Sequence, residues 1–506
     1  MRRRLEIRGG LVGIGAWGVA LSALGGCCLT SITGFGTAGP GTSGSTGGKS
    51  PSSAASSSAA GSTGASSSGT GSGARTTGGT SSAGTSSGGT SGGATMSGAS
   101  TGSISTAPAA LLLDAGADTI FGPVAIAVVP EPSGVGAARL VYSVGDGGQF
   151  GIMLQSITGD GGPLGVPIQI GTTQLSLSSP PNVAVSDDGT ATALCWEDYS
   201  VPWSVAASPD CDPSYSEQVV SCATVPENGG IPDASYSNCG WDPSLVFNPS
   251  SRDTQLFFMG VDFTFTPIDE WAYDQAASVS QEISAVDSAN PTGVPLPDQD
   301  GVIYTRRMRG GPGGESSGVL LATSAYAEGG YFGQSSTVMD PVYTSYDPEG
   351  CGEGPVPFVA ASNLGADIIE VLEWQRGVTC QQPGQLLQFI WQVDAGVGGT
   401  PTEIQSTAPL VGAIAVGVCP DAFENFMTTA LGTVLVAKVG FDGGMGDAPS
   451  YLTLPGFNQT PGLSRVDNSG LAEPSTSMAV APAPGGKLFL AISNPWQVGV
   501  YVVDCE

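Results

Sequence analysis

Three short stretches of the sequence place carboxylates directly beside aromatic rings, as in "CWEDYS" and "VLEWQR". Glycoside cleavage uses such a pair of carboxyl groups, one with a raised pKa that acts as the acid and one that stays ionised. Aromatic faces beside them can stack on sugar rings. These stretches supply the candidate ligand-binding residues Trp196, Glu197, Asp198, Asp269, Glu270, Trp271, Glu373 and Trp374.

The same residues also have a structural interpretation. A Trp near the end of a strand can pack between neighbouring sheets while the adjacent acids face water, and both interpretations stay open. No catalytic residue is assigned. The chain contains no histidine, which excludes Ser-His-Asp and Cys-His nucleophiles and histidine-ligated zinc. Carboxylate, tyrosine or arginine chemistry and bound Ca²⁺ remain.

One basic cluster stands out, because "RRMRG" brings together Arg306, Arg307 and Arg309. Guanidinium groups bind a carboxylate of a substrate or partner, or neutralise nearby acids. Asp-Gly turns offer oxygen ligands of the kind that Ca²⁺ prefers, although no complete EF-hand pattern exists. No cofactor is certain, and structural Ca²⁺ is the alternative, with the candidate ligands Asp298, Asp300, Asp442 and Asp447.

The charge of the chain limits its partners. Residues 107–506 contain nine Lys or Arg and 43 Asp or Glu, which gives a formal charge of −34. Nucleic acid and anionic lipid head groups are therefore poor partners for most of this surface, and cations are better ones. Solubility and self-repulsion outside the cell explain the acidity equally well.

Repetition predicts the elements that position these residues. Short apolar runs separated by Gly, Pro, Asp and Asn clusters, without a long helical period, indicate an all-β domain. Seven apolar strand seeds recur 55 to 65 residues apart, and they start at positions 123, 182, 244, 301, 357, 412 and 477. Units of three or four strands cannot bury their own faces, and stacking them radially gives a β-propeller. We predict about seven four-stranded blades, within a range of six to eight.

The two ends of the domain are predicted to close this ring. The last unit stops after "VGVYVVD" at 498–504, and "AALLLDAG" at 109–116 is the expected missing strand, which would leave no exposed edge. The unit from position 301 is poorly formed around "RRMRGGPGGESSG". A chain of β-sandwiches is the alternative, but units of about 57 residues are short against the roughly 100 of an immunoglobulin-like domain. "SDDGT" at 186–190 resembles the Asp-box turn of sialidases, but Thr190 stands where that turn has Gly, and we predict a plain hairpin turn.

Cysteine usage indicates export. An even number of cysteines and no CxxC spacing favour four disulfides over a metal site. We expect Cys195 and Cys222 on consecutive strands, with Cys211 and Cys239 in the flanking loops. The disulfide candidates are Cys195, Cys211, Cys222, Cys239, Cys351, Cys380, Cys419 and Cys505.

The N-terminus carries a targeting signal. Four arginines precede an apolar run at 11–24 that is too short to span a bilayer comfortably. Leu24-Gly25-Gly26-Cys27 then resembles the bacterial lipobox. The resemblance implies cleavage before Cys27, a diacylglycerol on its thiol and further acylation of its amine. The next residue, Cys28, is not Asp, which by the sorting rule of that family favours the outer membrane.

We therefore divide the chain into a lipoprotein signal peptide at 1–26, a lipidated linker at 27–106 and a β-propeller domain at 107–506. The linker is so rich in Gly, Ser and Thr that it cannot offset its ordering entropy, and it is expected to be a disordered tether with a span of roughly 45 Å.

The expected function is that of a lipoprotein anchored in the outer membrane, facing the periplasm or the cell surface. Its propeller is predicted to be a binding or scaffold module for a polysaccharide, a protein or a cation-linked ligand, and not for nucleic acid. The alternative is a carbohydrate-active hydrolase or lyase that uses carboxylates at the propeller mouth. Binding is favoured over catalysis.

Overall fold

The computed structural model describes most of the residues between 104 and 505, all of them in the second of two compact units, 93–506. Cys27, Cys28, the predicted signal peptide and nearly all of the predicted linker lie outside the described residues. No described helix is long and apolar enough to cross a membrane. The described ranges are 104–116, 119–130, 136–145, 148–174, 180–199, 219–227, 233–250, 252–260, 269–274, 279–284, 288–297, 299–311, 314–325, 337–340, 358–375, 385–393, 397–446, 448–458, 465–466, 472–473 and 476–505.

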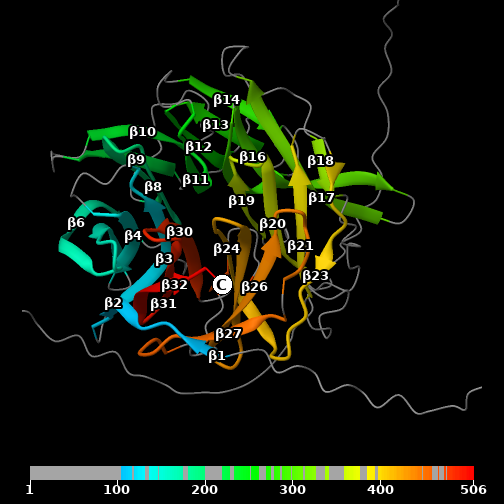
Figure 1. Ribbon diagram of the computed structural model, residues 1–506. Helices are drawn as coiled ribbons and strands as arrows, with labels where there is room; N and C mark the ends of the chain where they lie inside the picture. The colour runs from blue at the N-terminus through cyan, green and yellow to red at the C-terminus, as the bar shows by residue number, and fades with distance from the viewer. Residues whose placement is uncertain are drawn as a thin grey trace, which may run out of the picture. The chain divides into compact units, whose positions relative to one another are not determined.

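The described residues form seven sheets of four or five strands and one pair of short strands (Figure 1). We number the seven sheets in chain order of their first strands. Sheets 1 to 3 are β3 (Ile120–Val128), β4 (Ala138–Gly145), β5 (Gln149–Ile157) and β6 (Pro163–Gln174); β7 (Val183–Asp187), β8 (Ala191–Asp198), β9 (Val219–Pro226) and β10 (Asp233–Cys239); and β11 (Trp241–Asn248), β12 (Asp253–Gly260), β13 (Asp269–Asp274) and β14 (Val279–Ser284). Sheets 4 and 5 are β15 (Ser288–Leu296), β16 (Gln299–Gly311), β17 (Gly314–Ala325) and β18 (Thr337–Asp340); and β19 (Phe358–Asn363), β20 (Ile368–Gln375), β21 (Gln385–Gln392), β22 (Val397–Gly398) and β23 (Thr402–Glu403).

Sheets 6 and 7 take strands from both ends of the domain. They are β24 (Leu410–Val418), β25 (Ala422–Thr429), β26 (Thr433–Gly440), β27 (Ser450–Thr453) and β1 (Ile104–Thr106); and β30 (Ser477–Ala483), β31 (Lys487–Asn494), β32 (Gln497–Asp504) and β2 (Ala109–Asp114). The separate pair is β28 (Arg465–Val466) with β29 (Ala472–Glu473).

The first strands of the seven sheets form a closed ring. Each of them, β3, β7, β11, β15, β19, β24 and β30, contacts the first strands of two neighbouring sheets. Antiparallel sheets arranged radially around a ring of first strands make a β-propeller. The predicted all-β propeller is confirmed, and seven sheets fall within the expected range.

The core lies between neighbouring sheets. Second strands such as β25 are buried at every position, because they have a sheet on each face and need no polar side. Leu140 of sheet 1 and Phe489 of sheet 7, for example, share one apolar cluster that joins the two sheets. Every sheet thus depends on its two neighbours for burial.

Six of the seven predicted strand seeds overlap first strands, and the seed at 301 does not. That segment is part of β16, the second strand of sheet 4, while the first strand is β15. Pro291 and Pro295 lie within β15, and proline lowers the strand tendency of a segment. The apolar pattern therefore predicted the neighbouring strand β16 as the first strand of this sheet. The stretch predicted to be poorly formed makes the long β16–β17 hairpin instead.

The predicted closure of the ring is confirmed. β2 pairs antiparallel with β32 and places Leu112 opposite Gly499, so that a blue strand lies beside a red one in Figure 1. β1 also adds to sheet 6, parallel to β27, with Ile104 opposite Tyr451. The segment 104–114 therefore links two sheets that are otherwise built from the C-terminal part of the domain.

Two of the expected disulfides are present. Cys195 and Cys222 are bonded and lie directly opposite each other on β8 and β9. Cys419 is bonded to Cys505, which joins sheet 6 to the C-terminal end of sheet 7. The expectation that Cys239 lies in a loop was wrong, since it is the last residue of β10. The remaining candidates, Cys211, Cys351 and Cys380, lie outside the described residues.

Candidate functional site

The first strands of neighbouring sheets run in the same direction. Asn182, just before β7, donates from Nδ2 to Oδ1 of Asp242 near the start of β11, at 2.5 Å. At the opposite ends, Asn248 of β11 donates to the backbone oxygen of Leu296 of β15 at 2.9 Å, and both are the last residues of their strands. Second strands run antiparallel to the first, so they end where first strands begin. We call this side of the ring the loop face, and it carries the ends of β4, β8, β12, β16, β20, β25 and β31.

The loop face collects the residues that the sequence singled out. The last three residues of β8, the first three of β13, the terminal part of β16 and the end of β20 all lie there, in four consecutive sheets. These segments contain Trp196, Glu197, Asp198, Asp269, Glu270, Trp271, Arg306, Arg307, Arg309, Glu373 and Trp374. For residues 269–271 and 306–309 the structure describes the backbone only. Positions spread over nearly 180 residues of sequence thus share one side of the propeller.

Glu197 is buried and holds two sheets together. Its Oε2 accepts hydrogen bonds from the backbone N of Asn182 and the hydroxyl of Tyr199, both at 3.0 Å. Its Oε1 accepts from Asn182 Nδ2 and from the backbone N of Asp242, both at 3.1 Å. Asp242 belongs to sheet 3 and has a φ of 50°, a left-handed conformation that Asp adopts more readily than most residues. The carboxylate of Glu197 therefore fixes the junction of sheets 2 and 3.

The neighbours of Glu197 are also buried. Trp196 packs in the cluster between sheets 1 and 2, and a Cβ added to Gly171 of β6 would lie only 2.7 Å from its Cζ2. Asp198 accepts a hydrogen bond from the hydroxyl of Ser221 at 3.2 Å. In sheet 5, Glu373 is buried and Trp374 is half-buried against the cluster shared with sheet 6. The packing of Trp196 between sheets is that of the structural interpretation of the acidic-aromatic stretches. Its expectation that the adjacent acids face water was wrong, since Glu197, Asp198 and Glu373 are buried. Donors of the protein take the place of water around Glu197 and Asp198.

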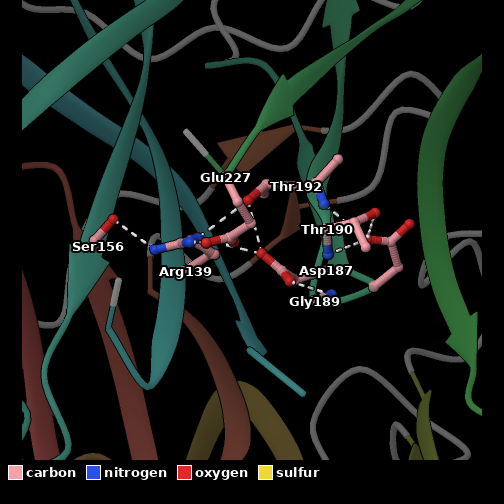
Figure 2. A network of polar contacts seen from close by, with 9 residues as sticks. Arg139, Ser156, Asp187, Gly189, Thr190, Thr192 and Glu227 are labelled. Atoms are coloured by element: carbon pink, nitrogen blue, oxygen red, sulfur yellow. Dashed lines mark hydrogen bonds and ion pairs between the residues drawn. The ribbon is translucent and has the colours of Figure 1, made fainter. Parts of the chain in front are cut away.

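A second polar network, on the side opposite the loop face, joins sheets 1 and 2 (Figure 2). Buried Arg139 of β4 donates from Nε to Asp187 Oδ2 at 3.2 Å and to Thr192 Oγ1 at 3.1 Å. Its Nη1 donates to Ser156 Oγ at 2.7 Å, and its Nη2 pairs with Glu227. Two carboxylates compensate the buried guanidinium, as a buried charge requires. Arg139 was not among the residues predicted from the sequence, although a lone Arg at the start of an apolar strand is a signal of such pairing.

Asp187 of this network also shapes the "SDDGT" turn. Its Oδ1 accepts from the backbone N of Gly189 at 2.8 Å, and Asp188 accepts from that of Thr190 at 2.7 Å. The turn joins β7 to β8 as a hairpin, as predicted. Burial raises the pKa of Asp187, while hydrogen bonds from Thr192 and Gly189 and the charge of Arg139 oppose that shift.

The candidate Ca²⁺ ligands are separated. Asp300 is buried and its Oδ1 accepts from Asn248 Nδ2 at 2.9 Å, while Oδ1 of Asp442 accepts from the backbone N of Gly444 in a different sheet. Asp298 and Asp447 lie outside the described residues. Among the described residues, ligand atoms of Cys419, Glu424 and Cys505 lie within 4.8 Å of one another. The two sulfurs are bonded to each other, so they are not thiolate ligands.

A buried acid between sheets 5 and 6 escaped the sequence analysis. Glu370 of β20 accepts a hydrogen bond from Nδ2 of Asn425 of β25 at 2.7 Å. Its Oε2, Asn425 Oδ1 and Gln388 Oε1 are buried with no hydrogen-bond partner. Burial raises the pKa of Glu370 well above that of an ordinary glutamate, and the single amide donor only partly opposes this. An acid enclosed by apolar residues in "IIEVL" was the available signal.

The comparisons with known proteins give distant likenesses in fold. No protein-family model matches the chain, and no curated protein matches it. The β-propeller domain of the Trilobed protease from Pyrococcus furiosus shares 11% identity at a TM-score of 0.40, over 76% of this chain and 96% of that one. The polysaccharide lyase Uly1 shares 10% at a TM-score of 0.41, over 73% and 88%. The Aleuria aurantia lectin shares 12% at 0.36, over 68% and 98%. The assignment of the fold rests on the strand order and register of this chain.

The role of Glu197 is testable by Glu197→Gln. The amide replaces one carboxylate oxygen by an NH₂ group, which would face a backbone N–H donor of Asn182 or Asp242. We expect the free energy of unfolding of the full chain to fall by about 1–3 kcal/mol in urea denaturation. Glu403→Gln, at an exposed position of β23, is the matched control and should change it little. Equal stability of both variants would contradict the role assigned to Glu197.

Glu370 predicts a pH dependence. Because the pKa of Glu370 is raised in the folded state, the folded protein retains a proton that the unfolded chain releases above about pH 4.3. The stability that this group contributes is therefore complete below that pH and is lost as the pH rises through the raised pKa. Glu370→Gln is neutral throughout, so the variant should gain stability relative to wild type as the pH rises. Urea denaturation from pH 4 to 8 measures the difference, and parallel curves would contradict the prediction.

Proposed function

We propose that this protein is an outer-membrane lipoprotein that displays its β-propeller as a binding module for a polysaccharide at the cell surface. The observation that carries the proposal is the loop face, where sheets 3 and 4 place the acidic-aromatic start of β13 and the basic end of β16 on one side of a closed ring. A rigid scaffold that presents variable connections on one face suits recognition, since little order is lost on binding.

Binding is favoured over hydrolysis by the state of the described carboxylates. Glu197, Asp198 and Glu373 are each at most 4% exposed, and both oxygens of Glu197 already accept hydrogen bonds from the protein. A glycoside hydrolase needs two carboxyl groups that reach the scissile bond and the attacking water. These three acids are buried inside the propeller and are not presented to a substrate at its surface.

The anchor is supported by the sequence of the N-terminal region. The lipobox-like Leu24-Gly25-Gly26-Cys27 follows a basic and apolar leader, and the Gly/Ser/Thr-rich linker at 27–106 would carry the propeller away from the lipid surface. Several buried acyl chains, at roughly 0.8 kcal/mol per CH₂, would hold the chain firmly on a membrane.

The anchor is tested by expressing the full chain in a two-membrane bacterium. Cys27→Ser should lose the acylated N-terminal peptide in mass spectrometry and leave the membrane fraction, because the acceptor thiol is gone. Cys28→Ser removes the neighbouring thiol and should stay acylated and membrane-bound. Acylation of the Cys27→Ser protein would contradict the anchor.

The binding function is tested with a panel of bacterial and plant polysaccharides. We expect at least one of them to retard the full chain in affinity gel electrophoresis, without new oligosaccharides in mass spectrometry. New oligosaccharides would replace this proposal by the hydrolase or lyase, and the absence of any retardation would overturn polysaccharide binding.

A further inference from the structure

The β16–β17 hairpin is longer than the corresponding hairpins of the other sheets. The second strands β4, β8, β12, β20, β25 and β31 each have eight residues, while β16 has 13 and β17 has 12. The first strand of sheet 4 begins at Ser288, which lies opposite Arg306. Residues 307–311 therefore continue beyond the first strand, over about 16 Å at roughly 3.3 Å per residue. The hairpin extends past the paired part of its own sheet at the loop face.

This extension is basic in an acidic protein. Arg306, Arg307 and Arg309 are three of the nine Lys or Arg in residues 107–506, where the formal charge is −34. Across the hairpin, Gly318 lies opposite Arg306 and Ser317 opposite Arg307. Glu315 is the one acid within 306–318, so this stretch carries a formal charge of +2.

We propose that the β16–β17 hairpin is a binding arm for a carboxylate-bearing polysaccharide, whose uronate groups pair with the guanidinium groups of Arg306, Arg307 and Arg309. This inference rests on the proposed function and specifies its ligand. A carboxylate accepts two parallel hydrogen bonds from one guanidinium, a geometry that a lysine does not offer. Arg307 lies opposite Ser317, and Arg309 follows two residues later in β16, at a register shift between Met308 and Gly311. The backbone therefore brings both arginine positions to the extended end of one hairpin, where they can act on one ligand chain.

The charge of the domain explains why the ligand is a saccharide rather than nucleic acid. A DNA duplex carries one phosphate charge per about 1.7 Å of its axis, and the surrounding surface of net charge −34 would repel it along its length. A polyuronate carries one carboxylate per sugar ring, beside uncharged hydroxyl groups, so its charge is less dense than that of a duplex. A single carboxylate of such a polymer can bind at the extended end of the hairpin.

The test measures the Kd of the full chain for polygalacturonate oligosaccharides and for their methyl esters, in which an uncharged ester replaces each carboxylate. We expect the esters to bind at least tenfold more weakly, and the affinity for the acid form to fall as salt is added. Arg307→Gln with Arg309→Gln should weaken binding of the acid form at least tenfold. Lys438→Gln with Lys487→Gln removes the same charge from sheets 6 and 7, where the two lysines pair with Asp421 and Asp504, and should change the Kd less than twofold.

Each other outcome has a distinct meaning. Equal losses in the two double variants would assign the effect to net charge and overturn the binding arm. Equal binding of the acid and the esters would also overturn it, while polysaccharide binding as such would survive. Tighter binding of poly-glutamate than of the uronate would replace the saccharide by an acidic peptide. Failure of every polysaccharide in the wider panel would overturn the proposed function itself.

Discussion

Burial on both faces of each sheet is the constraint on which this structure depends. A single sheet of the propeller, with second strands such as β25 buried at every position, would expose two apolar faces if it stood alone. Only a closed ring supplies two neighbours for every sheet. For this reason the domain joins its own ends, with β2 in sheet 7 and β1 in sheet 6, and the Cys419–Cys505 disulfide holds the same two sheets together.

The closed ring also determines the surroundings of its buried polar side chains. Arg139, Glu197 and Glu370 all lie between sheets, where water is excluded, and each is matched by partners from the neighbouring sheet. Arg139 has two carboxylates, Glu197 has N–H and O–H donors, and Glu370 has a single amide. Because a buried charge is costly without partners, burial raises the pKa of Glu370, and the single amide beside it opposes this shift only in part. Polar contacts thus orient the sheets that the apolar core holds together.

Ligand-binding residues are expected at positions that the ring does not require for its own packing. The described acids of the loop face, such as Glu197 and Glu373, are buried in the junctions, whereas the β16–β17 hairpin extends beyond the first strand of its own sheet. Positions beyond Arg306 have no partner in the first strand of their own sheet, so their residue types can follow the demands of a ligand. The basic composition of this hairpin, within a domain of formal charge −34, fits that division.

The sequence by itself determined the class of fold, the period of its units and the strand at 109–116 that closes the ring, because alternating strands and turns are local signals that repeat. It also brought Cys195 and Cys222 onto neighbouring strands. Only the tertiary structure decided that β15, with two prolines, is the first strand of sheet 4, since its contacts to sheets 3 and 5 are distant in sequence. It likewise decided that Glu197 serves a junction, because Asn182 and Asp242 reach it only when sheets 2 and 3 pack. Local patterns encode strands, but the partners of a side chain depend on which sheets meet.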